Sequence, residues 1–346
     1  MNTTALLLAS LVTLSIACAP DASEPAAGTD VASQTSAAPV RTVYAGASDY
    51  RALAGDASYV YWTESSTRTV KRAPRAGGEP TVLWTGHGMD SLGEIVVANG
   101  VVYFTEDGRV LSVPATGGTA TELARASRDF PSYLAVDGEY VYWAGENENE
   151  ANYLSYIRRV KTTGGRYETV YTGYYGVSSF AVKDGAVYFA GSDATILMNP
   201  PHRLMKVLGS GGSPTQLLET PGVIRSLAVD GEHAFVAIAD GGWELDAVDV
   251  AGGAKKTLLT LPLADGNEID RLGVSSDKVY WASAGTFDFG QKDPDNHDAH
   301  IWSVAKTGGE RELVGEHIAS PNSVSMAGQC PIWTAHLTIE TPARCH

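Results

Sequence analysis

The chain has 346 residues, of which 44% are hydrophobic and 19% are charged, and its formal net charge is -15 at pH 7. This amount of apolar material can form one large core or two ordinary ones, which excludes a mainly disordered chain. The negative charge repels phosphate backbones and anionic lipid headgroups, so nucleic acid is excluded as the expected partner.

The first 17 residues are predicted to be a signal peptide. Residues 5–17 read ALLLASLVTLSIA, an apolar run that is too short to span a bilayer comfortably as a permanent helix. The run ends in SIAC, residues 15–18, which resembles the lipobox of bacterial lipoproteins, where a cysteine becomes the lipid-bearing N-terminus. The resemblance implies a lipid on Cys18, and the alternative is an ordinary cleaved signal with an incidental cysteine.

Residues 18–39 are predicted to be a disordered tether, because they are rich in Ala, Ser, Thr and Pro without apolar periodicity. The folded domain is expected over residues 40–346. Apart from Cys18 the chain has two cysteines, Cys330 and Cys345. An exported chain can form disulfides, so we expect these two to pair, with two free thiols as the alternative.

A short apolar and aromatic motif recurs seven times along the chain. The copies are YVYWTE at Tyr59, VVYFTE at Val101, YVYWAG at Tyr140, AVYFAG at Ala186, HAFVAI at His233, KVYWAS at Lys278 and CPIWTA at Cys330. The copies are spaced by about 40 to 50 residues, a period that indicates a solenoid or a propeller. Each copy is predicted to be a strand.

Turn signals flank most of the copies. LAVDGE at 134–139 and FAVKDG at 180–185 each place Asp-Gly before a copy, and this pair favours a tight hairpin turn. IRRVKTTGG at 157–165 ends in paired glycines, which tolerate a second reversal before another β-run. Each unit is therefore predicted to have four antiparallel strands, a, b, c and d.

The motif is apolar at consecutive positions, as at Val141, Tyr142 and Trp143, so both faces of each sheet should be buried. Neighbouring blades of a β-propeller bury both faces, whereas a sandwich would alternate apolar and polar residues. We therefore predict an all-β, seven-bladed propeller of four-stranded antiparallel blades, with six blades as the alternative. The last unit lacks strand d, and VRTVYAG at 40–46 is predicted to supply it and close the ring.

At VYWTE and VYWAG, followed by the basic VKR or IRR and a Gly turn, the sequence resembles the YWTD repeats of LDL-receptor class B-like propellers. The resemblance covers about residues 45 to 335. The chain is also similar to the propeller lipoproteins of bacteria. This likeness implies an exported, lipid-anchored protein that binds at the cell surface.

The b–c connections are the long ones, and the a–b and c–d turns at the opposite end are tight. Loops on a rigid scaffold often carry function, so we expect a binding rim at this end, with tolerated insertions as the alternative. Four aromatic residues are predicted to stand exposed on the rim: Tyr153, Tyr156, Trp243 and Phe287. For Tyr156 and Trp243, packing against the blade edges is the alternative.

The d–a connections are expected to line the central opening on the same face. The candidate ligand-binding residues there are His87, Asp129, Tyr175 and Arg225, and Asp270 and Arg271 lie in the same kind of connection. Some seven-bladed propellers are lyases or lactonases with a His or carboxylates at this opening, often with a metal, and a neighbour-tuned group could act as a general base. The chain has no G-x-S-x-G, H-E-x-x-H or phosphate-loop motif, so no catalytic residue is assigned.

The b–c loop of the sixth unit is rich in metal-ligand types. Asp293, Asp295 and His297 have the spacing of the start of a calcium loop, and His297 and His300 form a pair that would suit zinc. Asp298 replaces the turn glycine of that loop and Val304 its terminal Glu, so a solvated acidic loop is the alternative. No cofactor is predicted, and calcium ranks ahead of zinc as the candidate ion.

The sequence thus predicts an exported, lipid-anchored propeller of the bacterial cell envelope that binds a protein, peptide or glycan through its b–c loop face. Its contact with the membrane would be the lipid anchor alone. The alternative is a metal-dependent lyase or hydrolase with its site at the axial opening. The identity of the ligand does not follow from the sequence.

Overall fold

The computed structural model of the chain describes residues 39–46, 50–86, 92–125, 129–147, 154–173, 176–193, 195–196, 200–264, 267–283, 299–318, 324–335 and 338–344. These residues belong to one compact unit, Gln34–His346, and their regular elements are β-strands. Within these ranges no helix is long and apolar enough to cross a membrane.

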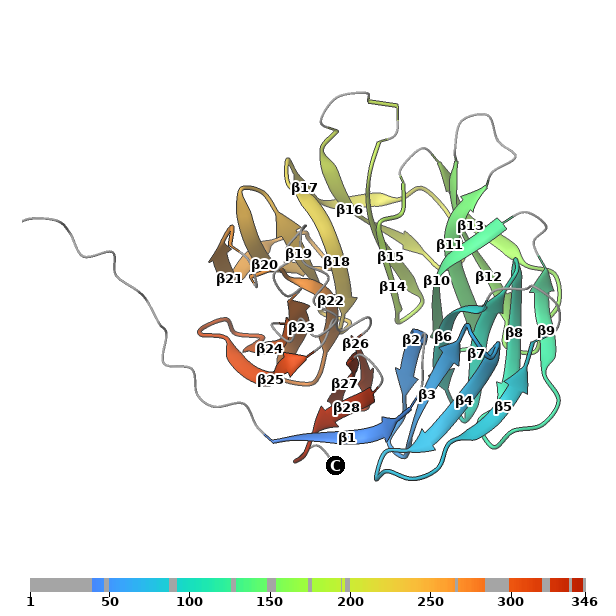
Figure 1. Cartoon of the computed structure of the whole chain (residues 1–346). Helices are drawn as coiled ribbons and strands as arrows, with labels where there is room; N and C mark the ends of the chain where they lie inside the picture. Colours follow the sequence, from blue (N-terminus) through green and yellow to red (C-terminus); the bar gives the residue numbers. More distant parts are fainter. Residues whose placement is uncertain are drawn as a thin grey trace, which may run out of the picture. The chain divides into compact units, whose positions relative to one another are not determined.

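Five sheets in the described ranges have four antiparallel strands each, with sequence neighbours hydrogen-bonded to one another (Figure 1). The first holds β6 (Leu92–Ala98), β7 (Val101–Glu106), β8 (Arg109–Pro114) and β9 (Thr121–Arg125). The second holds β10 (Asp129–Asp137), β11 (Tyr140–Asn147), β12 (Ser155–Lys161) and β13 (Glu168–Gly173). The third holds β14 (Ser179–Lys183), β15 (Ala186–Ser192), β16 (His202–Leu208) and β17 (Thr215–Thr220). The fourth holds β18 (Val223–Val229), β19 (His233–Ala239), β20 (Gly242–Asp249) and β21 (Lys255–Pro262), and the fifth β22 (Asp270–Val274), β23 (Lys278–Ser283), β24 (Ala299–Ala305) and β25 (Glu312–Ile318).

The remaining eight strands form one continuous sheet in the order β1-β28-β27-β26-β2-β3-β4-β5. They are β1 (Val40–Ala45), β2 (Tyr50–Gly55), β3 (Tyr59–Glu64), β4 (Thr69–Pro74), β5 (Thr81–Thr85), β26 (Val324–Ala327), β27 (Cys330–Ala335) and β28 (Thr338–Pro342). The two halves meet at a single parallel pair, Gly55 and Ala327. A Cβ at Gly55 would lie 2.5 Å from that of Ala327, so glycine permits this close approach.

The prediction of seven separate four-stranded blades is therefore wrong. The described residues form five four-stranded blades and one eight-stranded sheet. The physical reason is the bare backbone at Gly55, which lets β2 and β26 hydrogen-bond across what the repeat marks as a boundary.

The first strand of each repeat unit lies innermost, and these strands follow one another around a centre. β2 packs against β6, β6 against β10, β10 against β14, β14 against β18, β18 against β22, β22 against β26, and β26 against β2. This closed order is that of a β-propeller, and the all-β class is confirmed.

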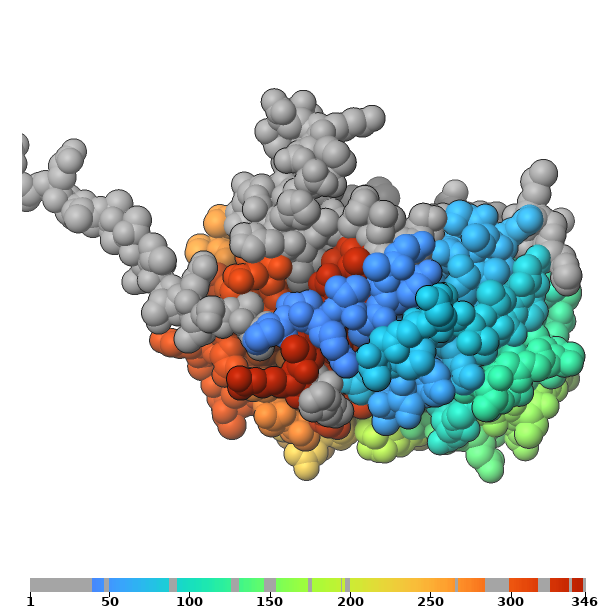
Figure 2. Space-filling view, turned by 60° about the horizontal axis from the view of Figure 1, so that its bottom comes forward, coloured from blue at the N-terminus to red at the C-terminus, as the bar shows by residue number. Residues whose placement is uncertain are grey.

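The N-terminal strand closes the ring, as predicted. β1 pairs antiparallel with β28, with Val40 opposite Pro342 and Ala45 opposite Thr338. Figure 2 shows the blue residues of β1 lying against the red residues of β28. The first and the last strand of the folded unit thus pair with each other, so neither leaves this edge open.

All seven copies of the motif are strands, namely β3, β7, β11, β15, β19, β23 and β27. Val141, Tyr142 and Trp143 in β11 are at most 2% exposed, as burial of both faces requires. The core lies between neighbouring sheets: one cluster packs Tyr103 of β7 against Trp143 of β11. The paired faces explain why the motif does not alternate between apolar and polar residues.

The two ends of the sheets differ. We call the end with the a–b and c–d turns the turn face, and the end with the d–a and b–c connections the loop face. On the turn face, Asp184 and Gly185 both have positive φ, 51° and 72°, as the predicted hairpin turn requires. At Asp137 and Gly138 only the glycine does, with φ of 57°.

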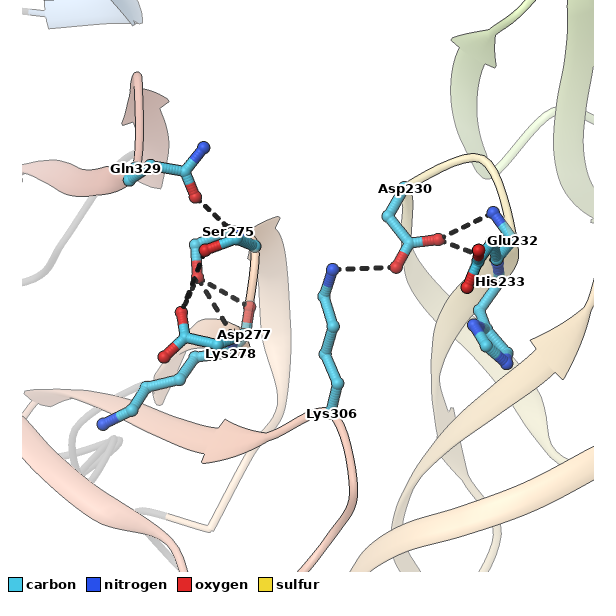
Figure 3. A network of polar contacts seen from close by, with 9 residues as sticks. Asp230, Glu232, His233, Ser275, Asp277, Lys278, Lys306 and Gln329 are labelled. Atoms are coloured by element: carbon cyan, nitrogen blue, oxygen red, sulfur yellow. Dashed lines mark hydrogen bonds and ion pairs between the residues drawn. The ribbon is translucent and has the colours of Figure 1, made fainter.

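Polar contacts join neighbouring sheets across the turn face (Figure 3). Lys306, after β24, forms an ion pair of 2.8 Å with Asp230, which follows β18. Asp230 also accepts hydrogen bonds from the backbone N–H groups of Glu232 and His233. The side chain of Gln329 accepts a hydrogen bond from the N–H of Ser276, which links the last two units. Polar groups in these turns thus form ion pairs and hydrogen bonds with groups in the neighbouring turns.

Candidate functional site

Three charged residues on the loop face each lie near the start of an innermost strand. They are Arg51 in β2, Glu94 in β6 and Arg271 in β22, and we call them the mouth cluster. β6 packs against β2 and β10, whereas β22 packs against β18 and β26. The positive charges of Arg271 and Arg51 nevertheless both lower the pKa of Glu94.

The carboxyl group of Glu94 has an unusual environment. Burial raises its pKa to about 7, and the positive charges of Arg271 and Arg51 oppose this rise. The loss of hydration therefore outweighs two favourable charges. Glu94 can gain or release a proton near neutral pH, which is the property of a general acid or base and of a pH-dependent binding group.

Threonine hydroxyls of the repeat motif fix the start of the inner strands. Thr105 in β7 accepts a hydrogen bond of 2.9 Å from the N–H of Glu94. Thr63, at the matching place in β3, accepts from the N–H of Ala52 and donates to the carbonyl of Gly93 in the next sheet. The Thr of the TE motif thus positions the backbone that carries Glu94.

Other hydroxyl groups join neighbouring sheets at the same level. Tyr133 donates a hydrogen bond to the carbonyl of Ser178, and the hydroxyl of Ser178 donates to the carbonyl of Ile224. The hydroxyl of Ser226 accepts from the N–H of Leu272, beside Arg271. The mouth cluster therefore stands on a backbone held by contacts between sheets.

The backbone of Arg271 adopts an uncommon conformation, with φ of 51°. For a residue other than glycine this left-handed region costs about 1 kcal/mol. The carboxylate of Asp270 accepts a hydrogen bond of 2.8 Å from the N–H of Arg271 and supports the conformation. Residues held in such conformations occur often at functional sites.

The guanidinium groups of Arg51 and Arg271 are exposed, and neither forms an ion pair or a side-chain hydrogen bond with the residues that the structure describes. Several cations elsewhere are paired, such as Lys71 with Glu64, and Lys255 with Asp246 and Glu244. The mouth cluster thus offers two unsatisfied cationic groups.

Arg225 lies near the start of β18 on the same face and is also exposed. It was predicted to line the central opening, and it stands at the place in its unit that Arg51 occupies in β2. Burial lowers the pKa of the nearby His202, and the charge of Arg225 lowers it further. The charge of Arg225 thus influences the pKa of His202, in β16 of the neighbouring sheet, and not that of Glu94.

We expect Glu94→Gln to stabilise the protein in a pH-dependent way. Because the pKa is about 7 in the folded state and 4.5 ordinarily, ionisation of Glu94 destabilises the fold above pH 4.5, with the full cost above pH 7. The variant should match the wild type at pH 4.5 and gain up to about 3 kcal/mol at pH 8, measured by urea unfolding.

Glu122→Gln is the control for this prediction. The hydrogen bond from Arg125 lowers the pKa of Glu122, so ionised Glu122 favours folding and its replacement should weaken the fold at pH 8. If the stability of Glu94→Gln relative to the wild type does not change with pH, Glu94 is an ordinary solvated carboxylate.

The structure corrects the predicted aromatic rim. Tyr156 lies inside β12 and is 2% exposed, and Trp243 lies inside β20 and is 8% exposed. Both belong to core clusters, so the prediction that they stand exposed is wrong. The reason is that strand c begins earlier than the polar loop sequence suggests.

The other predicted site residues fall outside the described residues. These are Cys18, His87, Tyr153, Tyr175, Phe287, Asp293, Asp295, His297 and Cys345. Asp129 begins β10, and its side chain is likewise not described. Cys330 begins β27 with 5% exposure, and its pairing with Cys345 stays a prediction. The lipid on Cys18 and the calcium site also stay predictions.

Metal ligands do not gather in the described ranges, where no group of three or more His, Cys, Asp or Glu side chains could hold an ion. Glu94 and Arg51 were missed by the sequence analysis. The signal was present in LGEIVV at 92–97, where an acidic residue interrupts an apolar inner strand. What the sequence could not give is the burial of Glu94 and the influence of two arginines from other sheets on its pKa.

No protein-family model matches the chain, and no curated protein matches its sequence. Among solved structures, an oligogalacturonate lyase from Vibrio parahaemolyticus is 9% identical, with a TM-score of 0.66 over 88% of this chain and 93% of that chain. A chain of the mitotic checkpoint complex is 12% identical, with a TM-score of 0.64 over 97% and 99%. The WD40 β-propeller domain of Doa1 is 16% identical, with a TM-score of 0.60 over 89% and 97%.

These identities are low, so the comparisons establish the fold alone. The chain has a β-propeller fold, and its structural neighbours include both an enzyme and a member of a protein assembly. The fold is therefore compatible with binding and with catalysis.

Proposed function

We propose that the protein is a binding protein that holds a protein partner on its loop face. The observation that carries this proposal is the distribution of exposed apolar and cationic side chains. Ile196, Val223 and Leu263 are 40%, 37% and 73% exposed, and all three lie in or beside b–c or d–a connections. They share this face with exposed arginines, a residue type enriched at protein interfaces.

The turn face offers less to a partner. Its described polar groups engage one another, as Lys306 does with Asp230, and its turns are short. Of the large hydrophobic residues that stand exposed in the described ranges, Leu208 is on this face and Val82 is in an outermost strand. The difference between the two faces favours the loop face as the binding surface.

The structural neighbours are consistent with this role. By its name, the mitotic checkpoint complex is an assembly of proteins, and one of its chains has the same fold. Export, a lipid on Cys18 and a place in the cell envelope belong to the proposal and rest on residues 5–18. In this arrangement a tether would hold the propeller near the membrane surface.

Catalysis at the axial mouth is the second candidate, and Glu94 is the observation that favours it. A carboxyl group with a pKa of about 7 suits a general base, and one structural neighbour is a lyase. The described residues hold no group that fits a metal, so the metal-dependent form rests on residues 293–297.

Site-specific photocrosslinking in native cells tests the proposed function. A photoreactive amino acid at Val223 or Leu263 should give the same crosslinked protein, because both positions face the partner. Leu208 is the matched control, since it is 62% exposed on the turn face. A crosslink to that protein from position 208, or none from 223 and 263, would show that the loop face is not the binding surface.

A further inference from the structure

We propose that the loop-face end of the β18–β21 sheet binds a segment of the partner in which an apolar side chain lies next to a lysine or arginine. We call this surface the apolar end. It consists of Val223, Ala239, Pro262 and Leu263, with Asp240 among them. The identification of the ligand as part of a protein rests on the proposed function, whereas the surface itself rests on strand pairing, exposure and charge.

The apolar end is continuous across the sheet. Val223 in β18 lies opposite Ala239 in β19, and Gly242 in β20 lies opposite Pro262 in β21. The N–H of Asp240 donates a hydrogen bond of 3.0 Å to the carbonyl of Gly242, which closes the short turn between β19 and β20. Val223, Asp240 and Pro262 are exposed, and Ala239 is half-buried. Apolar groups therefore follow one another from the innermost strand to the outermost.

The same end of other sheets is polar. In two of them the register aligns charged or polar residues: Glu106, Arg109 and Arg125 in the β6–β9 sheet, and Ser192, His202 and Thr220 in the β14–β17 sheet. The propeller fold therefore does not require an apolar end. A group of exposed apolar side chains bounded by polar neighbours is typical of a surface that a partner covers.

Two close approaches fix the turn that carries Asp240. A Cβ at Gly222, which precedes β18, would lie 2.6 Å from that of Asp240, and a Cβ at Gly242 would lie 2.9 Å from the carbonyl oxygen of Leu261. Glycine at both positions lets the turn lie against β18 and β21. Asp240 is exposed, and its carboxylate forms no hydrogen bond or ion pair with the residues that the structure describes. A carboxylate on a fixed turn loses little freedom when it binds a partner.

Asp240 decides the charge that the partner must carry. A partner that covers the apolar side chains also removes water from this carboxylate, and burial of a charge is costly unless the charge is paired. In β18 and around the start of β22, the positive charges of Arg225 and Arg271 are offset by the negative charges of Glu268 and Asp270, so the group that includes Asp240 is negative.

Other charges on these strands and on the sheet before them do not change this balance. They form ion pairs with one another: Arg203 with Glu219, and Glu244 with Lys255. The chain as a whole carries -15, which attracts a basic segment. A lysine or arginine of the partner therefore fits the place beside Asp240, and its apolar neighbour fits Val223 or Leu263.

Two short peptides test the proposal. N-acetyl-leucyl-lysine amide carries an apolar side chain next to one ammonium group, and N-acetyl-leucyl-glutamate amide is the charge-reversed control. Binding would be followed by nuclear magnetic resonance of the backbone N–H groups of the full chain. We expect the signals of residues 223, 239–242 and 263 to shift with the lysine peptide, which should bind about threefold more tightly than the glutamate peptide.

Variants make the test specific. Asp240→Asn should weaken binding of the lysine peptide about threefold, the size of an exposed ion pair. Asp107→Asn is the matched control, because Asp107 is exposed in the short turn between β7 and β8 on the same face, and it should change binding by less than about 1.5-fold. Leu263→Ser should weaken binding of both peptides, whereas Leu208→Ser on the turn face should weaken neither.

Three outcomes would overturn the proposal: no shift at these residues, equal binding of the two peptides, or equal losses in Asp240→Asn and Asp107→Asn. The result is separable from the proposed function. Binding of the lysine peptide without crosslinks from 223 and 263 would refute only the protein partner. A crosslink from position 223 whose yield is the same in Asp240→Lys would refute only the site.

Discussion

Removal of β1 is expected to destabilise the propeller by about 4 kcal/mol, since it exposes buried apolar surface and an open strand edge. Val43 is 3% exposed, and the ring of Tyr44 stacks on that of Trp62 at 5.1 Å. For a domain of this size such a loss should lower the Tm by about 10 °C. Calorimetry of a chain that lacks residues 40–46 measures the effect.

A chain that begins at Pro39 is the control for the deletion, because it keeps β1 and its pairing with β28. Val43→Ala and Thr42→Ala provide a second comparison, since Val43 is buried and its neighbour Thr42 is exposed. Val43→Ala should cost about 2 kcal/mol and Thr42→Ala less than about 0.5 kcal/mol. An unchanged Tm after the deletion would mean that β1 does not close the ring.

The strands of the propeller could be predicted because the repeat carries them directly. Val141, Tyr142 and Trp143 are apolar in a row only because sheets cover both sides, and this leaves a clear pattern. The closing strand could be predicted because the last unit has only three strands and residues 40–46 form one strand more than the units need. The number of separate blades did not follow, because it depends on one contact between Gly55 and Ala327, far apart in the sequence.

The candidate site could be predicted only in part. Arg225 and Arg271 were expected in d–a connections, and the structure has both inside strands, near the starts of β18 and β22. Glu94 is different, because its importance comes from burial and from two arginines of other sheets. A local sequence pattern does not show which residues of distant strands influence one another in the fold. The sequence also did not show where β12 and β20 begin, which is why Tyr156 and Trp243 were wrongly expected in loops.

Substitutions of Tyr156 test whether this residue belongs to the core or to the exposed rim. Its ring packs with Trp143 of β11 and Tyr103 of β7, and the guanidinium of Arg158 lies 4.2 Å from the ring centre. Truncation leaves a cavity that these neighbours cannot fill, so Tyr156→Ala should cost about 3 to 5 kcal/mol. Urea unfolding at neutral pH measures this loss.

Tyr156→Phe is the matched variant, and it should behave in the opposite way. The hydroxyl of Tyr156 is buried and has no hydrogen-bond partner among the described residues, and burial raises its pKa. Removing an unsatisfied polar group while keeping the ring should leave stability unchanged or raise it by up to about 1 kcal/mol. If Tyr156→Ala changed stability by less than about 0.5 kcal/mol, as surface substitutions do, Tyr156 would belong to the exposed rim after all.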